Sequence, residues 1–199
     1  MSHDTEAMQQ SPVVTISYPV TIDYRIPLGK MVRQAQFDMV ESFLINGKDF
    51  PHGQRGVEHI SIGLAPFNSG EESYFLAQYF QVHDDGSTTS KKISYNEICQ
   101  YLSEQNLQPI TLAQLCSLVA ALPDLYEVYE TLGKGEDFFI HAFGSSLCNK
   151  QGTGSIYTPC AKFGSESKDL GLLNFDADPQ DLFNDYIAVI IGDTPTATT

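Results

Sequence analysis

The sequence predicts an α+β fold, in which a mixed or antiparallel sheet packs against two central helices. Stretches near the N-terminus alternate apolar and polar residues, as half-buried strands do. Two amphipathic segments at 94–105 and 111–122, separated by a break at Pro109, predict the two helices. Gly and Pro then recur between short apolar runs, which is typical of loops that connect strands.

The N-terminal elements form a strand–helix–strand unit over residues 13–70. Val13–Tyr24 alternates apolar and polar residues and predicts a strand, with Pro19 at an edge or bulge. Leu28–Ile45 carries apolar residues at helical spacing, and Val57–Phe67 alternates again. We expect this unit to dock onto the remainder of the chain.

The central elements begin with an aromatic-rich strand at Tyr74–Val82 and a turn at Asp84–Ser87. Ser94 and Glu97 have the spacing of a capping box, which predicts the start of the first central helix. Thr111 lies two residues after Pro109 and is suited to cap the second helix.

The C-terminal half is rich in loops. Leu125–Leu132 predicts a short helix and Phe138–Phe143 a buried strand, with further short strands expected at 155–163 and 170–175. Tyr186–Ile191 is apolar at every position. Such a run is typical of a strand that is buried on both faces, so we expect it in the centre of the sheet.

The charge is strongly acidic. The chain has 25 Asp and Glu against 11 Lys and Arg, a net charge of −14. This balance argues against nucleic-acid binding, which requires clustered basic residues, and favours basic partners or cations. An acidic cytosolic surface without a binding role is the plainer alternative.

Targeting and membrane signals are missing from the sequence. Residues 1–12 contain no basic and apolar leader, and no apolar run approaches the length of a membrane span. We therefore expect a soluble, cytoplasmic protein without membrane contact. Residues 1–12 and 193–199 read as loose polar tails.

The four cysteines do not form a metal-binding pattern. Cys99 and Cys116 fall on apolar helical faces, whereas Cys148 and Cys160 lie in the loop-rich region and could approach each other. Reduced thiols are expected in the cytosol. No spacing matches a metal site, so the sequence predicts neither a metal nor a cofactor.

Two groups of residues carry a resemblance to a known architecture. They are Ile22-Asp23-Tyr24, Leu28, Met31-Val32, Phe37-Asp38, Val40 and Phe50-Pro51, and then Leu107–Leu112, Leu115, Leu118, Pro123–Leu125, Ala142–Ser145, Leu170–Leu172 and Tyr186–Val189. Their order resembles small, uncharacterised bacterial proteins. The C-terminal segment of those proteins is similar to the C-type-lectin-like fold of formylglycine-generating enzymes and of the variable proteins made by diversity-generating retroelements.

The resemblance implies a C-type-lectin-like domain over residues 71–192, a framework that displays variable binding loops. It implies that a Pro-Thr step opens the second helix and that the last apolar strand closes the sheet. This chain departs from the family in lacking Trp, with Met39 at one such position, and in carrying Asp185 where the family has Arg. No cysteine motif matches the formylglycine-generating enzymes, so their chemistry is not transferred.

By analogy with this fold, we expect a non-enzymatic module that binds a protein or another ligand through the loops between Gly144 and Asp185. We therefore expect no catalytic residues. The expected contact residues are Asn149, Lys150, Gln151, Tyr157, Asn174, Phe175, Asp176, Asp178 and Asp181.

Three alternatives remain open. An acidic inhibitor, for example a phage-encoded protein, would occupy a basic groove of its target. An enzyme would use Cys148 as a nucleophile with His141 as its base. The carboxylates of Asp176, Asp178 and Asp181 could bind Ca²⁺, although their spacing does not match an EF-hand, and a solvated acidic loop explains them equally well.

Overall fold

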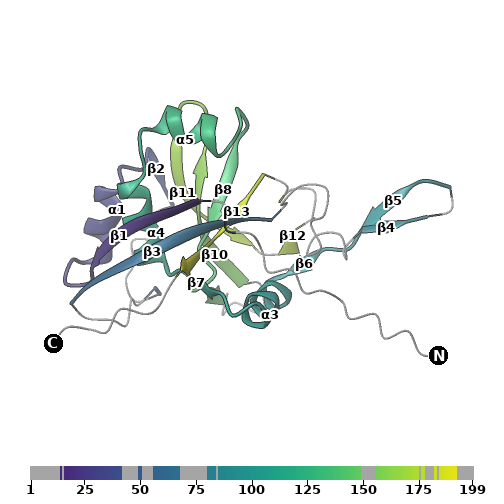
Figure 1. The fold of residues 1–199 in the computed structure, drawn as a ribbon, viewed down its shortest axis with the longest axis horizontal. Coiled ribbons are helices and arrows are strands. Elements are labelled where there is room, and N and C mark those ends of the chain that lie inside the picture. The colour runs from purple at the N-terminus through teal and green to yellow at the C-terminus, as the bar shows by residue number, and fades with distance from the viewer. Residues whose placement is uncertain are drawn as a thin grey trace.

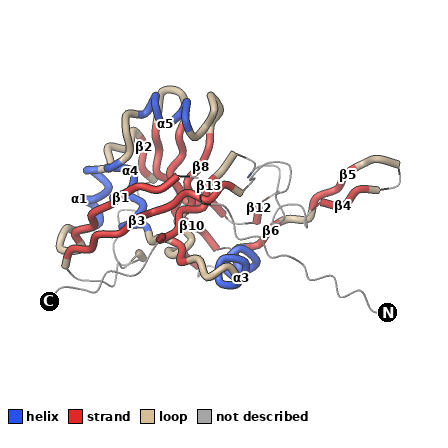
Figure 2. Tube along the Cα trace, in the orientation of Figure 1, coloured by secondary structure: helices blue, strands red, loops and turns tan. Residues whose placement is uncertain are grey.

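The computed structural model describes residues 14, 16–41, 49–50, 56–67, 80–83, 85–148, 156–174, 176–177, 182 and 184–191. Within these residues the chain forms four helices, one large sheet of nine strands and two small two-stranded sheets (Figures 1 and 2). Both parallel and antiparallel strand pairs occur in the large sheet. The expectation of an α+β fold with a mixed sheet is therefore confirmed.

The large sheet places strands from both ends of the chain side by side. Its order is β1 (Ile16–Asp23), β3 (Val57–Pro66), β13 (Tyr186–Ile191), β8 (Phe138–His141), β10 (Ile156–Phe163), β11 (Lys168–Asn174) and β2 (Met39–Val40), with β7 (Gln108–Pro109) paired to β13 and β9 (Leu147–Cys148) paired to β10.

Strand β13 is central and is buried on both faces. It pairs antiparallel with β3 and parallel with β8. Ile187 and Val189 belong to one hydrophobic core, whereas Tyr186 and Ala188 belong to the other. The uninterrupted apolar sequence of this strand is thereby explained, and its predicted central place is confirmed.

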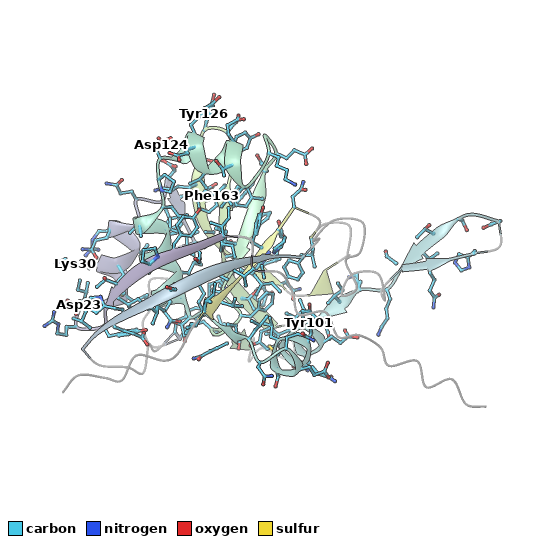
Figure 3. The ribbon with its side chains drawn as sticks, in the orientation of Figure 1. Asp23, Lys30, Tyr101, Asp124, Tyr126 and Phe163 are labelled. Atoms are coloured by element: carbon cyan, nitrogen blue, oxygen red, sulfur yellow. The ribbon has the colours of Figure 1, made fainter. Side chains whose placement is uncertain are left out.

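One face of the sheet carries α1 (Leu28–Gln34), α4 (Leu112–Ala121) and α5 (Leu125–Thr131). Helix α4 packs against β1, α1 and β10. Phe163 is buried in this core, whereas Tyr126 of α5 points away from the body and is 68% exposed (Figure 3).

The opposite face carries a smaller core that includes α3 (Tyr95–Glu104), which lies apart from α1 and α4 in Figure 1. Ile98 and Leu102 are the buried residues of α3. The two-residue strands β6 (Ile93–Ser94) and β12 (Asp176–Ala177) pair beside it. None of the helices in the described part of the chain is long and apolar enough to cross a bilayer.

Both predicted helix starts are confirmed. The Ser94 hydroxyl accepts a hydrogen bond from the Glu97 amide, and the Glu97 carboxylate accepts one from the Ser94 amide. Thr111 and Gln114 form the same reciprocal pair at the start of α4. Local side-chain chemistry fixes these two starts, which is why the sequence could locate them.

The helix predicted over residues 28–45 is wrong for residues 35–41, and residues 42–45 lie outside the described residues. Gln36 has a φ of 54°, a left-handed conformation that ends the helix. Met39 and Val40 then form β2 and pair in parallel with β11. Pairing with a strand more than a hundred residues away overrides the helical spacing of these apolar residues.

The predicted domain boundary between residues 70 and 71 lies outside the described residues, as do both predicted tails. The N-terminal strands β1 and β3 share one sheet with β13. The division into two structural units therefore stays a prediction.

Strands β4 (Phe80–Val82) and β5 (Thr88–Ser90) form a separate hairpin that projects from the body (Figures 1 and 2). The remainder of the predicted aromatic strand, 74–79, is not among the described residues.

Candidate functional site

The loop end of the sheet is the first candidate site. Tyr157 and Asn174 are directly opposite each other where β10 begins and β11 ends. At the same end, Cys148 of β9 is opposite Ile156 of β10, so residues 149–155 leave and rejoin the sheet at neighbouring positions. Two of the residues expected to contact a ligand are therefore brought together across 16 intervening residues of chain.

The chain beyond Asn174 is tied to the start of helix α3. Asp176 pairs with Ser94, and Ala177 pairs with Ile93, in the small β6–β12 sheet. Ser94 is also the residue that caps α3. The backbone at Asp176 is thus held against a helix start that is fixed by its own capping box.

The remaining expected contact residues are only partly described. Asn174 is exposed and Tyr157 is partly buried, and these two have described side chains. Of Asp176, the backbone alone is described. Asn149, Lys150, Gln151, Phe175, Asp178 and Asp181 lie outside the described residues. The acidic loop is therefore untested as a Ca²⁺ site, and the described residues contain no group of three or more His, Cys, Asp or Glu suited to a metal ion.

A buried histidine–aspartate pair is the second candidate site. His141 Nε2 lies 2.9 Å from Asp185 Oδ2, and the two side chains are 0% and 4% exposed. The other carboxylate oxygen, Oδ1, accepts a hydrogen bond of 2.9 Å from the Phe139 amide. The Asp185 backbone carbonyl accepts one from the Phe67 amide, and its amide donates to the Leu182 carbonyl.

Asp185 therefore joins three parts of the chain: the end of β3, strand β8 and the turn that precedes β13. Three aromatic rings surround the imidazole of His141, with centroids 5.6–6.0 Å away. They belong to Phe67, Phe139 and Phe143. Burying a polar group within such an apolar shell is costly unless its hydrogen-bond partner is in place.

The sequence suggested His141 as the base for a Cys148 nucleophile, whereas its Nε2 is engaged with Asp185. The sequence did not identify Asp185 as the partner of His141, because the two residues are 44 positions apart. The one signal available was that Asp185 stands where the resembling family has Arg.

Cys160 is the thiol next to this pair, since it is directly opposite His141 in the β8–β10 register. Burial, with a smaller effect of the Asp185 charge, raises the pKa of the Cys160 thiol to about 12. A thiol with such a pKa is protonated at neutral pH and is a poor nucleophile. On the same strand, the hydroxyl of Thr158 is fully buried and has no hydrogen-bond partner in the described part of the structure.

The expected Cys148 nucleophile is not tested by this geometry, because the side chain of Cys148 is not described. His141 is not placed to act as a base for a bound substrate, since its imidazole is enclosed and its Nε2 is engaged with Asp185. The arrangement has the features of a structural pair within the smaller core.

Comparisons with known proteins returned no relative. No protein-family model matches the chain, no curated protein matches it, and no solved structure matches it.

Proposed function

We propose that the protein is a binding module that recognises a protein or another ligand through loops at one end of its sheet. The observation that carries the proposal is the meeting of Tyr157 and Asn174 as cross-strand partners at that end. The ends of two adjacent strands hold an aromatic and an amide side chain next to each other, and loops continue from both ends. Such an arrangement is a favourable base for a binding surface.

The contact residues of this proposal are those expected from the sequence. Tyr157 and Asn174 supply the base of the surface, and Asp176 begins its acidic part. The loop residues that follow these strands complete it: Asn149, Lys150, Gln151, Phe175, Asp178 and Asp181. The preorganised strand ends would lower the ordering cost of recognition.

The framework we propose is a variant of the C-type-lectin-like fold. Three features support it: Thr111 caps α4 two residues after Pro109, helices α3 and α4 follow each other in the chain between β3 and β8, and the apolar strand β13 lies next to β3. The proposal also holds that the module is not catalytic, since apolar side chains enclose the buried His141–Asp185 pair.

The test is a binding comparison between the wild type and two variants. The ligands are an array of glycans and a set of proteins purified after capture from the native host's lysate. The first variant is Asp176→Asn/Asp178→Asn/Asp181→Asn, and the second is Tyr157→Ala/Asn174→Ala. A ligand that binds the wild type at high salt and loses at least tenfold in affinity with either variant supports the proposal.

A matched control variant is Glu127→Gln/Glu130→Gln, which removes acidic charge from α5, away from the loop end. It should bind as the wild type does. If every captured ligand binds the loop variants and the control equally well, the loop end is not the binding surface.

An acidic inhibitor of a basic protein is the second candidate function. The net charge of −14 favours it. Binding of this kind would fall steeply as salt rises and would weaken in all acidic-to-amide variants, including the α5 control. The same binding comparison therefore distinguishes the two functions.

A further inference from the structure

The first turn of helix α3 is held closed by its own side chains. The Ser94 amide and hydroxyl both donate to one oxygen of the Glu97 carboxylate, at 2.9 and 2.7 Å. The Glu97 amide donates to the Ser94 hydroxyl at 3.3 Å. Lys91 Nζ lies 3.0 Å from the other oxygen of the same carboxylate. A helix start that is closed by such a reciprocal pair has a defined geometry.

Tyr95, the first residue of α3, holds the chain that follows strand β8. Its hydroxyl donates to the Phe143 carbonyl at 3.0 Å, and the side chain of Ser146 is hydrogen-bonded to the same hydroxyl. The rings of Tyr95 and Phe143 are also in contact, with centroids 6.0 Å apart. We call residues 143–147 the first run. It leads into β9, which pairs with the start of β10 at Tyr157.

Ser94, the residue before Tyr95, is paired with the chain that follows strand β11. In the β6–β12 sheet Ser94 is directly opposite Asp176. Figure 1 shows β12 next to β6, which continues directly into α3. We call residues 174–177 the second run, which begins at Asn174, where β11 ends. Two consecutive residues at one helix start therefore contact both runs.

We infer that the first turn of α3 is a shared anchor that couples the two halves of the proposed binding surface, with Tyr95 as its positioning residue. The inference rests on the proposed function in taking the strand ends at Tyr157 and Asn174 as that surface. If Tyr95 releases the first run, the helix start loses one of its two attachments, and the second run loosens with it. Contact that orders one half then lowers the entropic cost of ordering the other, so the two halves act as one site.

The first run has another attachment, which does not involve α3. The Ser145 hydroxyl accepts a hydrogen bond of 3.0 Å from the Leu112 amide at the start of α4. The Gly144 amide donates to the Ile110 carbonyl at 2.8 Å. Because this attachment lies on a different helix, it can be removed without changing the contacts of Tyr95. The coupling can therefore be separated from a simple loosening of the first run.

The test measures amide hydrogen exchange of the full chain by two-dimensional NMR, in the protein alone. Bonded and non-bonded pairs alternate in an antiparallel ladder, so an amide of Asp176 or Ala177 donates to β6 and reports on the second run. Tyr95→Phe removes the hydroxyl and keeps the ring. Exchange should become roughly fivefold faster in residues 143–147 and about twofold or more faster at the reporting amide of β12.

Two control variants remove one hydrogen bond each and should leave the reporting amide of β12 unchanged. Ser145→Ala releases the first run from α4, so it should accelerate exchange in residues 143–147 alone. Tyr129→Phe removes a bond of the same kind as Tyr95→Phe does, from a tyrosine hydroxyl to the Gly135 carbonyl at 2.5 Å, and should accelerate neither run. A general loss of stability would appear in these controls as well.

Unchanged exchange in either run of Tyr95→Phe overturns the inference, because the two runs would then be held independently. Acceleration of the β12 amide by Ser145→Ala or Tyr129→Phe to the same extent also overturns it, since any loosening would then reach the second run. Failure of the Tyr157 end in the binding comparison leaves this measurement unaffected, because the exchange experiment contains no ligand.

Discussion

Replacing Asp185 by alanine is the most direct perturbation of the smaller core. The substitution removes the acceptor of the Phe139 amide and the partner of His141 Nε2, both at 2.9 Å. The imidazole and the Phe139 amide would then lose their contacts with the Asp185 carboxylate while staying inside the protein.

The expected cost follows from these two contacts. Leaving one buried polar group without its partner costs about 1–3 kcal/mol, and Asp185→Ala does so to two groups, the Phe139 amide and His141 Nε2. We therefore expect Asp185→Ala to lower the free energy of unfolding by about 2–6 kcal/mol. This is a large part of the roughly 5–15 kcal/mol that a folded domain has.

Urea unfolding followed by far-ultraviolet circular dichroism is the suitable assay, because the chain has no tryptophan to report by fluorescence. The matched control is Asp137→Ala, which removes a partner of Lys162 at 3.1 Å where the two side chains are 53% and 43% exposed. An exposed pair contributes at most about 1 kcal/mol.

Two further variants separate the contribution of the His141 contact from that of the Phe139 contact. His141→Phe alone leaves the buried carboxylate without its partner, whereas His141→Phe/Asp185→Asn removes the charge and keeps an oxygen for the Phe139 amide. The double variant should therefore be more stable than His141→Phe. If Asp185→Ala costs no more than Asp137→Ala, the structural role of the pair is refuted.

Three further predictions concern other parts of the fold. Hydrogen bonds from Ser94, together with the Lys91 side chain, lower the pKa of Glu97 from 4.5 to about 2. The difference in free energy of unfolding between the wild type and Glu97→Gln should therefore be largest above pH 4.5 and vanish as the pH falls towards 2. In Gly144→Ala the new Cβ would lie 2.6–2.7 Å from the carbonyl oxygens of Pro109 and Ile110, so thermal unfolding should show a loss of about 1–3 kcal/mol. Burial raises the pKa of the Cys160 thiol, so mass spectrometry should find it unlabelled by iodoacetamide in the native protein and labelled in urea.

Each of these predictions has a result that contradicts it. If the difference in free energy of unfolding between the wild type and Glu97→Gln did not change with pH, the capping carboxylate would not be its source. An unchanged melting temperature in Gly144→Ala, with Gly86→Ala as a comparison at an open but left-handed position, would contradict the close approach. Rapid native labelling of Cys160 would contradict its burial.

The sequence predicted those elements whose cause is local. The starts of α3 and α4 depend on Ser94, Glu97, Thr111 and Gln114, which are three residues apart in each pair. The apolar run of β13 is likewise a local signal, because a strand that is buried on both faces is apolar at every position. Elements of this kind need no knowledge of distant partners, so they were placed correctly.

Elements with distant causes were misplaced or missed. Met39 and Val40 have helical spacing relative to α1, but they form a strand that pairs with β11. The role of Asp185 became visible only when His141 and Phe139 were placed next to it. Of the candidate loop site, the sequence supplied Tyr157 and Asn174 as separate residues, and the β10–β11 register made them neighbours.

The central position of β13 has a consequence for biosynthesis. This strand joins β3 to β8, so the two halves of the large sheet have no shared neighbour until residues 186–191 have left the ribosome. During synthesis both β3 and β8 present an open edge, which is the kind of surface that pairs with other chains. Late arrival of a six-residue strand would therefore set the interval in which the nascent protein depends on chaperones.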